Sequence, residues 1–131
     1  MRDREARNRR VLVVDDDVEQ LEMVSRYLRL EGFQVATASE SIGVSNLVRS
    51  FDPHLVLLDV EIPALSGDRL LVLLRKHARR ETKFVLFSAW DEEKLRSLAM
   101  RVEAHGYISK STDRAQLGRR LRAFMARGDE P

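Results

Sequence analysis

Acidic side chains follow the ends of two short apolar runs. The run Val-Leu-Val-Val is followed at once by Asp15, Asp16 and Asp17, and the run Leu-Val-Leu-Leu is followed by Asp59. Apolar runs of this length fit strands that are buried on both faces. If the two strands are parallel neighbours, their carboxyl ends bring the carboxylates into the crevice where open α/β sheets bind ligands. Because clustered negative charges repel one another, such a site calls for a cation.

Ser88 and Lys110 follow apolar runs in the same way. Together with Asp59 and the acidic pair Asp15 and Asp16, they describe a site that transfers a phosphoryl group to a carboxylate, because a carboxylate oxygen can attack phosphorus. Mg²⁺ suits such a site, since it accepts one or two carboxylates together with phosphate and water. Lys110 would place a point charge on one phosphoryl oxygen, and the Ser88 hydroxyl would hydrogen-bond another. Asp59 is the candidate phosphoacceptor.

The first acidic cluster also has a purely structural interpretation. Asp16 and Glu19 have the spacing of a capping box, so the aspartates could serve only to begin the next helix. That interpretation fits Asp17 as well as a ligand role does. It does not explain why Asp59 follows a different strand.

The elements that must position these residues alternate between strand and helix along the whole chain. The pattern predicts strands at about 11–15, 33–37, 55–58, 84–87 and 106–109, and helices at about 17–31 and 40–50, around Leu70 to Leu74, after Asp91 and after Thr112 or Asp113. This alternation is typical of parallel βαβ units, whose right-handed crossovers place the helices on both faces of one sheet. The leucines and valines at helical spacing, including Val18 and Leu73, are predicted core residues.

Composition excludes several classes of protein. The 131 residues contain no cysteine, and the three histidines lie in separate segments, so disulfides and cysteine or histidine metal sites have no support. The sequence has no apolar stretch long enough for a membrane span and no signal-peptide core, which predicts a cytoplasmic protein without membrane contact. Lys and Arg number 23 against 21 Asp and Glu, so direct binding of nucleic acid by this domain is not expected.

At these positions the chain resembles the receiver domain of bacterial two-component response regulators. The resemblance covers about residues 10–127, with 1–9 as a basic N-terminal tail and 128–131 as a C-terminal tail. It rests on Val13-Val14-Asp15-Asp16-Asp17, Leu57-Leu58-Asp59-Val60-Glu61-Ile62-Pro63, the Gly67 loop, Phe87-Ser88-Ala89 and Tyr107-Ile108-Ser109-Lys110.

The resemblance implies an α/β flavodoxin-like fold: a five-stranded parallel sheet in the order 2-1-3-4-5 with five helices on both faces. It implies Mg²⁺ held by Asp16, Asp59 and the backbone carbonyl of Glu61, with Asp15 contributing through water. It also implies transfer of a phosphoryl group to Asp59 from the phosphohistidine of a sensor histidine kinase or phosphotransfer domain. Ser88 and Tyr107 match the switch pair of the family.

Three positions depart from the commonest pattern of this family: Ser111, Trp90, and Ser66, which stands where the family often has Asp before Gly67. Ser111 follows Lys110 where the family usually has proline after a cis peptide bond, and a cis bond before serine would cost about 2.5–4 kcal/mol. Trp90 and Glu61 would border the approach of water to an aspartyl-phosphate. We expect Trp90 to shield that bond, and the other possibility is that it only packs on the fourth helix.

The sequence leaves alternatives for function and partners. A pseudo-receiver that never takes phosphate would be an interaction module of the same fold, and a flavin-binding protein would need a phosphate-binding loop where the three aspartates stand. An active receiver would have at most weak autophosphatase activity. The face of the fourth helix, fifth strand and fifth helix is a candidate homodimer surface, and it is predicted to carry Arg101, Glu103, Asp113, Arg119 and Arg122. The chain is either a stand-alone receiver or part of a longer regulator or hybrid kinase.

Overall fold

A computed structural model describes residues 9–61 and 67–127 of the chain. Five parallel strands form one sheet in the order β2-β1-β3-β4-β5. In chain order the elements are β1 (Arg10–Val14), α2 (Val18–Leu30), β2 (Gln34–Ala38), α3 (Val44–Phe51), β3 (Leu55–Asp59), α4 (Gly67–Arg75), β4 (Lys83–Ser88), α5 (Glu92–Arg101), β5 (Gly106–Ser109) and α6 (Arg114–Arg127). The predicted fold class and strand order are confirmed.

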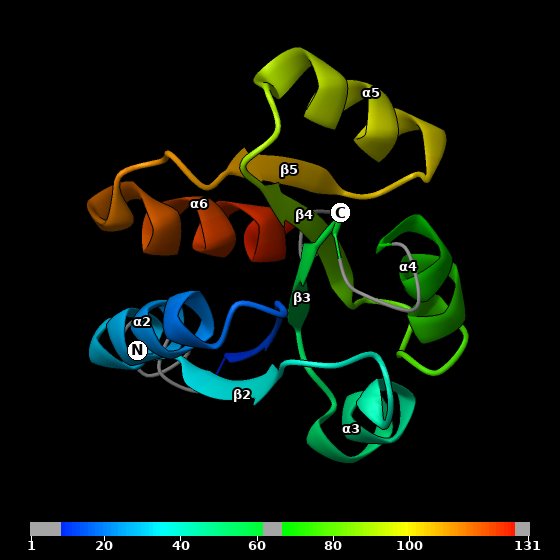
Figure 1. The fold of residues 1–131 in the computed structure, drawn as a ribbon. Coiled ribbons are helices and arrows are strands. Elements are labelled where there is room, and N and C mark those ends of the chain that lie inside the picture. Colours follow the sequence, from blue (N-terminus) through cyan, green and yellow to red (C-terminus); the bar gives the residue numbers. More distant parts are fainter. Residues whose placement is uncertain (1–8, 62–66, 128–131) are drawn as a thin grey trace.

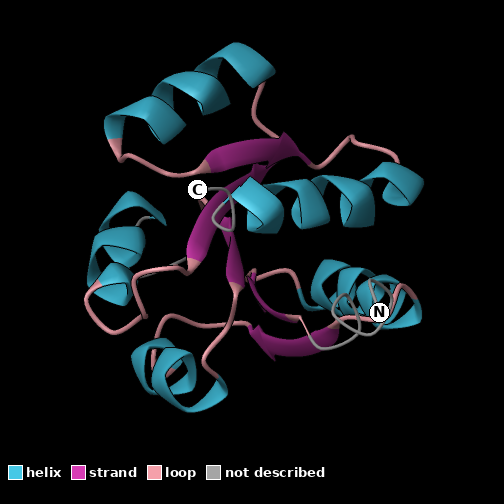
Figure 2. Cartoon of the chain, turned by 180° about the vertical axis from the view of Figure 1, so that it is seen from behind, coloured by secondary structure: helices cyan, strands magenta, loops and turns pink. Residues whose placement is uncertain are grey.

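The helices divide between the two faces of the sheet (Figures 1 and 2). On one face α2 and α6 cover a core that includes Leu28, Leu57 and Leu121. On the other face α3, α4 and α5 cover a core that includes Leu58 and Leu70. The central strands are buried on both faces, as continuous apolar runs predict. None of the described helices is long and apolar enough to cross a bilayer.

The boundaries of α2 follow from its capping residues. The Asp17 carboxylate accepts a hydrogen bond from the backbone N–H of Gln20 at 3.2 Å, so Asp17 is the N-cap. The expected capping box that starts at Asp16 is therefore wrong by one residue. At the other end Gly32 takes a left-handed φ of 100°, and the N–H of Phe33 donates to the carbonyl of Leu28, which completes a Schellman motif.

Three expectations about the helices were wrong. The helix predicted at 40–50 begins later, at Val44, because Gly43 takes a left-handed φ of 84° just before it, and Ile42 is left 86% exposed. Val18 is 61% exposed, since the first residue of a helix has few neighbours to cover it. Leu73 is 39% exposed because it lies at the edge of the buried stripe of α4.

Gly106 sets how closely α6 approaches β5. A Cβ atom added at this position would lie 2.2 Å from Cε1 of Phe124 in α6. A side chain at this position would therefore force the Phe124 ring to move. Glycine at the start of β5 lets this ring pack directly on the strand.

Two histidines lie at the amino-terminal ends of the strands, opposite the acidic residues. Nδ1 of His54 accepts a hydrogen bond from the backbone N–H of Arg10 at 2.9 Å, and Nδ1 of His105 accepts one from Phe84, also at 2.9 Å. A ring nitrogen that accepts a hydrogen bond carries no proton, so these contacts favour the neutral rings. Burial, assisted by nearby arginines, lowers the pKa of His54 to about 4, and burial also lowers the pKa of His105.

His54→Asn should make the protein less sensitive to acid. The pKa of His54 falls from 6.5 in a model peptide to about 4 in the fold, so the unfolded chain binds more protons between these values. Stability is then lost as the pH falls from about 6.5 to about 4. Asparagine keeps an acceptor oxygen but does not titrate. Urea unfolding at both ends of this range should show a smaller acid-induced loss in the variant, and equal losses would contradict the assignment.

Candidate functional site

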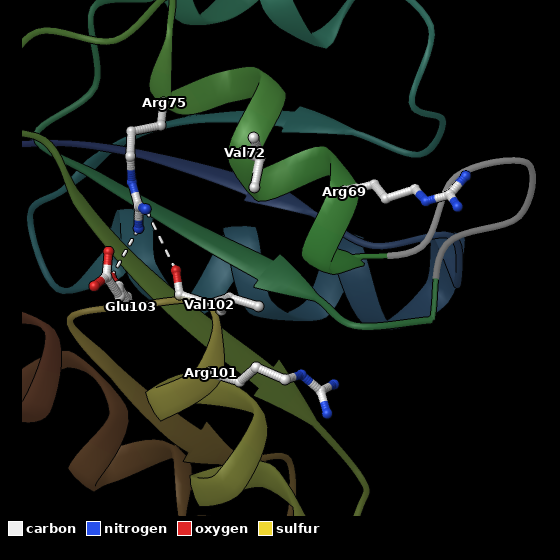
Figure 3. Close-up of a pocket in the computed structure, with 6 residues that line it drawn as sticks. All are labelled: Arg69, Val72, Arg75, Arg101, Val102 and Glu103. Atoms are coloured by element: carbon white, nitrogen blue, oxygen red, sulfur yellow. Dashed lines mark hydrogen bonds between the residues drawn. The ribbon is translucent and has the colours of Figure 1, made fainter.

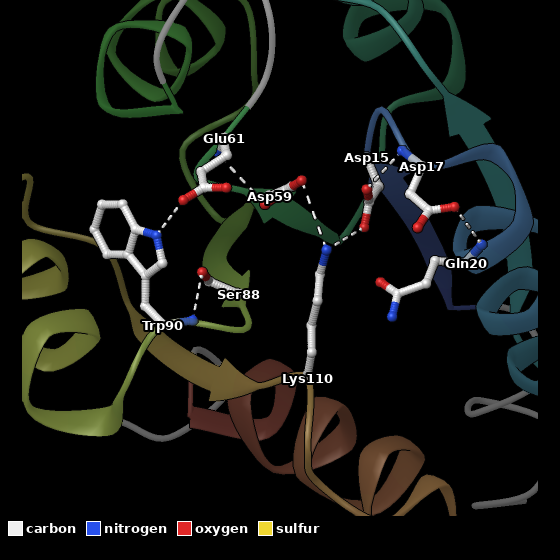
Figure 4. Close-up of polar contacts among 8 residues, drawn as sticks. All are labelled: Asp15, Asp17, Gln20, Asp59, Glu61, Ser88, Trp90 and Lys110. Carbon is white, nitrogen blue, oxygen red and sulfur yellow. Dashed lines mark hydrogen bonds and ion pairs between the residues drawn. The ribbon is translucent and has the colours of Figure 1, made fainter.

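The polar residues singled out in the sequence meet at the carboxyl ends of adjacent strands. Asp59 and Ser88 are the last residues of β3 and β4, while Asp15 and Lys110 directly follow β1 and β5. Because β1, β3, β4 and β5 are consecutive neighbours in the sheet, their ends lie together. Figure 4 shows the Lys110 side chain reaching from the β5 side toward Asp15 and Asp59.

The predicted acidic cluster is present. Carboxylate oxygens of Asp15, Asp16 and Asp59 all lie within 4.8 Å of one another. Asp15 and Asp59 are buried, with 2% and 5% of their surface exposed, whereas Asp16 is exposed. Ligand oxygens on opposite sides of one Mg²⁺ are about 4.2 Å apart, since each Mg–O bond is about 2.1 Å long. The oxygen donors and their spacing therefore fit a magnesium ion.

Lys110 neutralises two of these carboxylates. Its Nζ lies 2.8 Å from Oδ2 of Asp15 and 3.6 Å from Oδ2 of Asp59. Burial by itself lowers the pKa of Lys110, but the contacts with the two aspartates outweigh it and the net shift is upward. The lysine therefore stays charged and acts as a counter-cation inside the site.

The backbone around Lys110 keeps the side chain directed at Asp15 and Asp59 although residue 111 is serine and not proline. The Lys110 N–H donates to the carbonyl of Ser88 at 2.8 Å, which extends the pairing of β5 with β4 by one bond. The peptide bond to Ser111 is trans, as are all bonds in the described residues. The hydroxyls of Ser109 and Ser111 lie 2.8 Å apart and hydrogen-bond each other, which closes the turn.

Asp59 is an unusually basic carboxylate for its type. Burial is the largest cause that raises the pKa of Asp59 from 3.8 to about 6, and the neighbouring Asp15 adds to the rise. The Glu61 N–H, which donates to Oδ1 of Asp59 at 3.2 Å, and the charge of Lys110 act in the opposite direction. A higher pKa means a more basic oxygen, which favours nucleophilic attack once the proton is absent.

Ser88 and Tyr107 lie on the same face of neighbouring strands. Leu86 pairs with Tyr107 and Ser88 pairs with Ser109, so the side chains of Ser88 and Tyr107 both point toward α5. Ser88 is buried and its Oγ accepts the Trp90 N–H at 3.1 Å. The Tyr107 hydroxyl accepts a hydrogen bond from Nε of Arg96, on α5, at 3.0 Å. The expected switch residues are therefore adjacent.

Trp90 lies at the margin of the site, where it also packs on the core. Its indole N–H donates to the Glu61 carboxylate, as Figure 4 shows. Nζ of Lys94, on α5, lies 4.1 Å from the centroid of the indole. A cavity of about 460 Å³ opens beside Trp90 and Lys110. The two roles considered for Trp90 were shielding of an aspartyl-phosphate and packing on the fourth helix. The position of this side chain is compatible with both.

Comparison with known protein families agrees with this geometry. The family model described as the response regulator receiver domain matches residues 11–122. The chain belongs to this receiver domain family. Receiver domains are signalling domains of two-component systems.

Curated relatives and solved structures extend the comparison. The phosphate regulon transcriptional regulatory protein PhoB of Klebsiella pneumoniae is 34% identical over 120 residues, which are 91% of this chain and 52% of that protein. The DNA-binding response regulator MtrA of Mycolicibacterium paratuberculosis is 34% identical over 121 residues, which are 92% of this chain and 53% of that protein. The chain thus spans about half the length of the curated relatives it matches.

Two solved receiver structures show the same arrangement of elements. The CheY-like receiver domain protein of Methanospirillum hungatei has a TM-score of 0.82 at 22% identity, over 92% of this chain and 96% of that one. The BeF3-activated N-terminal receiver domain of Klebsiella pneumoniae RstA has a TM-score of 0.80 at 28% identity, over 88% of this chain and 97% of that one. The first of these supports the fold alone.

The charged residues expected on one output face of the receiver belong to different surfaces. Arg122 packs on the end of α2, where its guanidinium lies 4.8 Å from the Phe33 ring and 4.0 Å from the Glu31 carboxylate. Arg101 and Glu103 line a cavity of about 540 Å³ between α4 and α5 (Figure 3). The prediction that Arg101, Glu103 and Arg122 share one face was wrong, because helical spacing does not say which neighbour covers each side of a surface helix.

Arg75, which lines this cavity, links α4 to α5 through hydrogen bonds. Its guanidinium donates to the backbone carbonyls of Val102 and Glu103, at the carboxyl end of α5 (Figure 3). A cation at this end complements the helix dipole and satisfies carbonyls that have no partner within the helix. Arg75, the last residue of α4, thus caps the carboxyl end of α5.

Sequence reasoning missed one residue beside the site, Gln20. It lies in the first turn of α2, and the oxygen of its side-chain amide is buried. Its position three residues after the N-cap Asp17 has the spacing of a capping box, which indicates a helix start and not a place beside the site. Only the fold shows that this turn faces Lys110 (Figure 4).

Proposed function

We propose that the chain is a phosphorylatable receiver that accepts a phosphoryl group on Asp59 and changes a partner-binding face in response. The observation that carries the proposal is the combination of a buried, basic Asp59 carboxylate with a charged Lys110 and two further carboxylates within reach of one cation. The phosphohistidine of a sensor histidine kinase or phosphotransfer domain is the proposed donor.

Each residue has a defined task in this reaction. An Asp59 carboxylate oxygen attacks phosphorus, the P–N bond of the phosphohistidine breaks, and the departing imidazole nitrogen takes up a proton from solvent. Lys110 and the buried Ser88 hydroxyl contact the phosphoryl oxygens and hold them in line. Mg²⁺, held by Asp16, Asp59 and the Glu61 carbonyl, with Asp15 acting through water, would neutralise charge on the transferred group.

A pseudo-receiver is the competing proposal. Such a module would not need the acceptor, the lysine or the acidic pair, and all of them are present and close together here. The test is to incubate the protein with Mg²⁺ and acetyl phosphate and to measure its intact mass. One added phosphoryl group supports the active receiver, and an unchanged mass supports the pseudo-receiver.

The proposed output surface is formed by α5, β5 and α6. Ser88 and Tyr107 both lie beneath α5, so movement of the Ser88 hydroxyl toward a phosphoryl group would free space for the tyrosine ring. A homodimer through this surface is one proposed partner state. Sedimentation of the phosphorylated and unphosphorylated protein tests it.

Trp90→Ala should shorten the lifetime of phosphorylated Asp59, about three- to tenfold. Hydrolysis needs a water in line with phosphorus, and Trp90 both covers the margin of the site and holds Glu61, which would otherwise be free to orient that water. Loss of one such contact is worth about 0.5–1.5 kcal/mol. The half-life of the phosphorylated protein, followed by intact mass after removal of the phosphodonor, measures the effect.

Trp90→Phe separates the contribution of the aromatic cover from that of the hydrogen bond to Glu61. Phenylalanine keeps an aromatic cover but cannot donate a hydrogen bond to Glu61. A lifetime close to that of the wild type would assign the effect to the cover, and a lifetime close to that of the alanine variant would assign it to Glu61. An unchanged half-life in Trp90→Ala would show that Trp90 is only a packing residue.

A further inference from the structure

Gln20 carries a buried polar atom with no hydrogen-bond partner in the part of the chain that the structure describes. That atom is the amide oxygen Oε1. The backbone of Gln20 is fixed by the N-cap, since its N–H donates to Oδ1 of Asp17. Figure 4 shows the side-chain amide on the side of α2 that faces Lys110. A buried oxygen without a donor is unfavourable and rare, so this atom calls for a donor that another state of the site supplies.

Lys110, in contrast, has more hydrogen-bond donors than acceptors around it. An ammonium group offers three N–H donors, and Nζ of Lys110 has two acceptors, the carboxylates of Asp15 and Asp59. Among the described residues the third donor of Nζ has no acceptor. The Gln20 amide, whose oxygen lacks a donor, thus faces an ammonium with a donor to spare (Figure 4).

The acidic cluster connects these two groups to the cation. Asp15 and Asp59, which hold Lys110, also belong to the three carboxylates that fit Mg²⁺. A divalent cation attracts the same oxygens and repels the ammonium, so binding weakens the two ion pairs of Lys110. The lysine then needs a new acceptor if it is to remain inside the site.

We propose that Gln20 is a positioning residue of the phosphoacceptor site, whose amide oxygen accepts a hydrogen bond from Lys110 when a divalent cation occupies the acidic cluster. This proposal rests on the proposed function for the identity of the cation. The contact keeps the lysine within reach of the phosphoryl oxygens after its carboxylates are engaged elsewhere. Because the contact is made only in the cation-bound state, it favours that state and raises the affinity for Mg²⁺.

Gln20→Met tests the proposal with two readouts of opposite sign. Methionine has a similar length and no strong acceptor. Without divalent cations the variant should melt about 2–6 °C higher than the wild type, since a buried unsatisfied oxygen is removed. Its dissociation constant for Mg²⁺, measured by isothermal titration calorimetry, should rise about three- to tenfold. A residue that only packs would not give both changes.

Three variants serve as controls. Gln116→Met makes the same substitution at an exposed position of α6 and should change neither readout. Gln20→Glu keeps an acceptor oxygen and adds a negative charge, so its affinity for Mg²⁺ should be no lower than that of the wild type. In a Lys110→Met background, Gln20→Met should have no further effect on that affinity, because the donor is gone.

The outcomes separate this proposal from the proposed function. Mg²⁺ binding by the wild type with an unchanged dissociation constant in Gln20→Met overturns the role of Gln20 alone. An equal loss of affinity in the Lys110→Met background also overturns it, since the effect would not pass through the lysine. Failure of the wild type to bind Mg²⁺ overturns both proposals.

Discussion

Asp59→Asn is expected to abolish phosphorylation: its intact mass should stay unchanged after incubation with Mg²⁺ and acetyl phosphate. The asparagine amide is not a nucleophile toward phosphorus, whereas the Asp59 carboxylate is both buried and more basic than usual. The substitution keeps the size of the side chain and an acceptor oxygen for the Glu61 N–H. The fold should therefore persist while the reaction is lost.

Asp17→Asn is the matched control for this variant. Asp17 is exposed, and its carboxylate caps α2, a task that asparagine performs equally well. The control should gain one phosphoryl group at a rate close to that of the wild type. An adduct on Asp59→Asn would place the phosphoacceptor elsewhere and would refute the proposed reaction.

Asp16→Asn is expected to weaken Mg²⁺ binding by on the order of 100-fold, because a cation site is tuned by the number of charged ligands. Asp16 is exposed and has no hydrogen bond or ion pair with any described residue, whereas Asp15 and Asp59 are engaged by Lys110. It is therefore the carboxylate most available to the ion. Loss of one exposed charge should leave the unfolding midpoint without metal nearly unchanged.

Calorimetric titration of Asp16→Asn with Mg²⁺ measures the loss of affinity. Phosphorylation by acetyl phosphate should be slow at low Mg²⁺ and recover at high Mg²⁺, since mass action refills a weakened site. No such recovery is expected for Asp59→Asn, which lacks the nucleophile. An unchanged affinity in Asp16→Asn would show that the cation is held without this carboxylate.

The grouping of the candidate site residues was predictable from the sequence because it follows from local rules. Apolar runs define strands buried on both faces, and a polar residue at the end of each run marks the ligand edge of a parallel sheet. Asp15, Asp59, Ser88 and Lys110 could thus be assigned to one site before any distance was known. The Asp91 cap of α5 also followed from a local signal, and its carboxylate accepts the Lys94 N–H at 2.9 Å.

Features that depend on packing between distant segments were not predictable in the same way. The sequence predicts a surface charge at Arg122 in the last helix. In the structure Arg122 stacks on Phe33, which is distant from it along the chain. The contact between Trp90 and Glu61 joins two loops, and helical spacing does not show that the amide oxygen of Gln20 is buried. Periodicity gives the buried stripe of a helix, but it does not identify what covers the rest.

The internal counter-cation Lys110 has a consequence for synthesis of the chain on the ribosome. Asp15 and Asp59 come from β1 and β3, which emerge early, whereas Lys110 follows β5 and emerges much later. Until then a nascent sheet holds two buried carboxylates without their ammonium partner, and burying unpaired charges opposes collapse. Arrival of the last strand supplies that charge and completes the sheet edge in a single step. A ribosome-bound chain stalled before Lys110 leaves the exit tunnel should therefore be less compact than the complete domain.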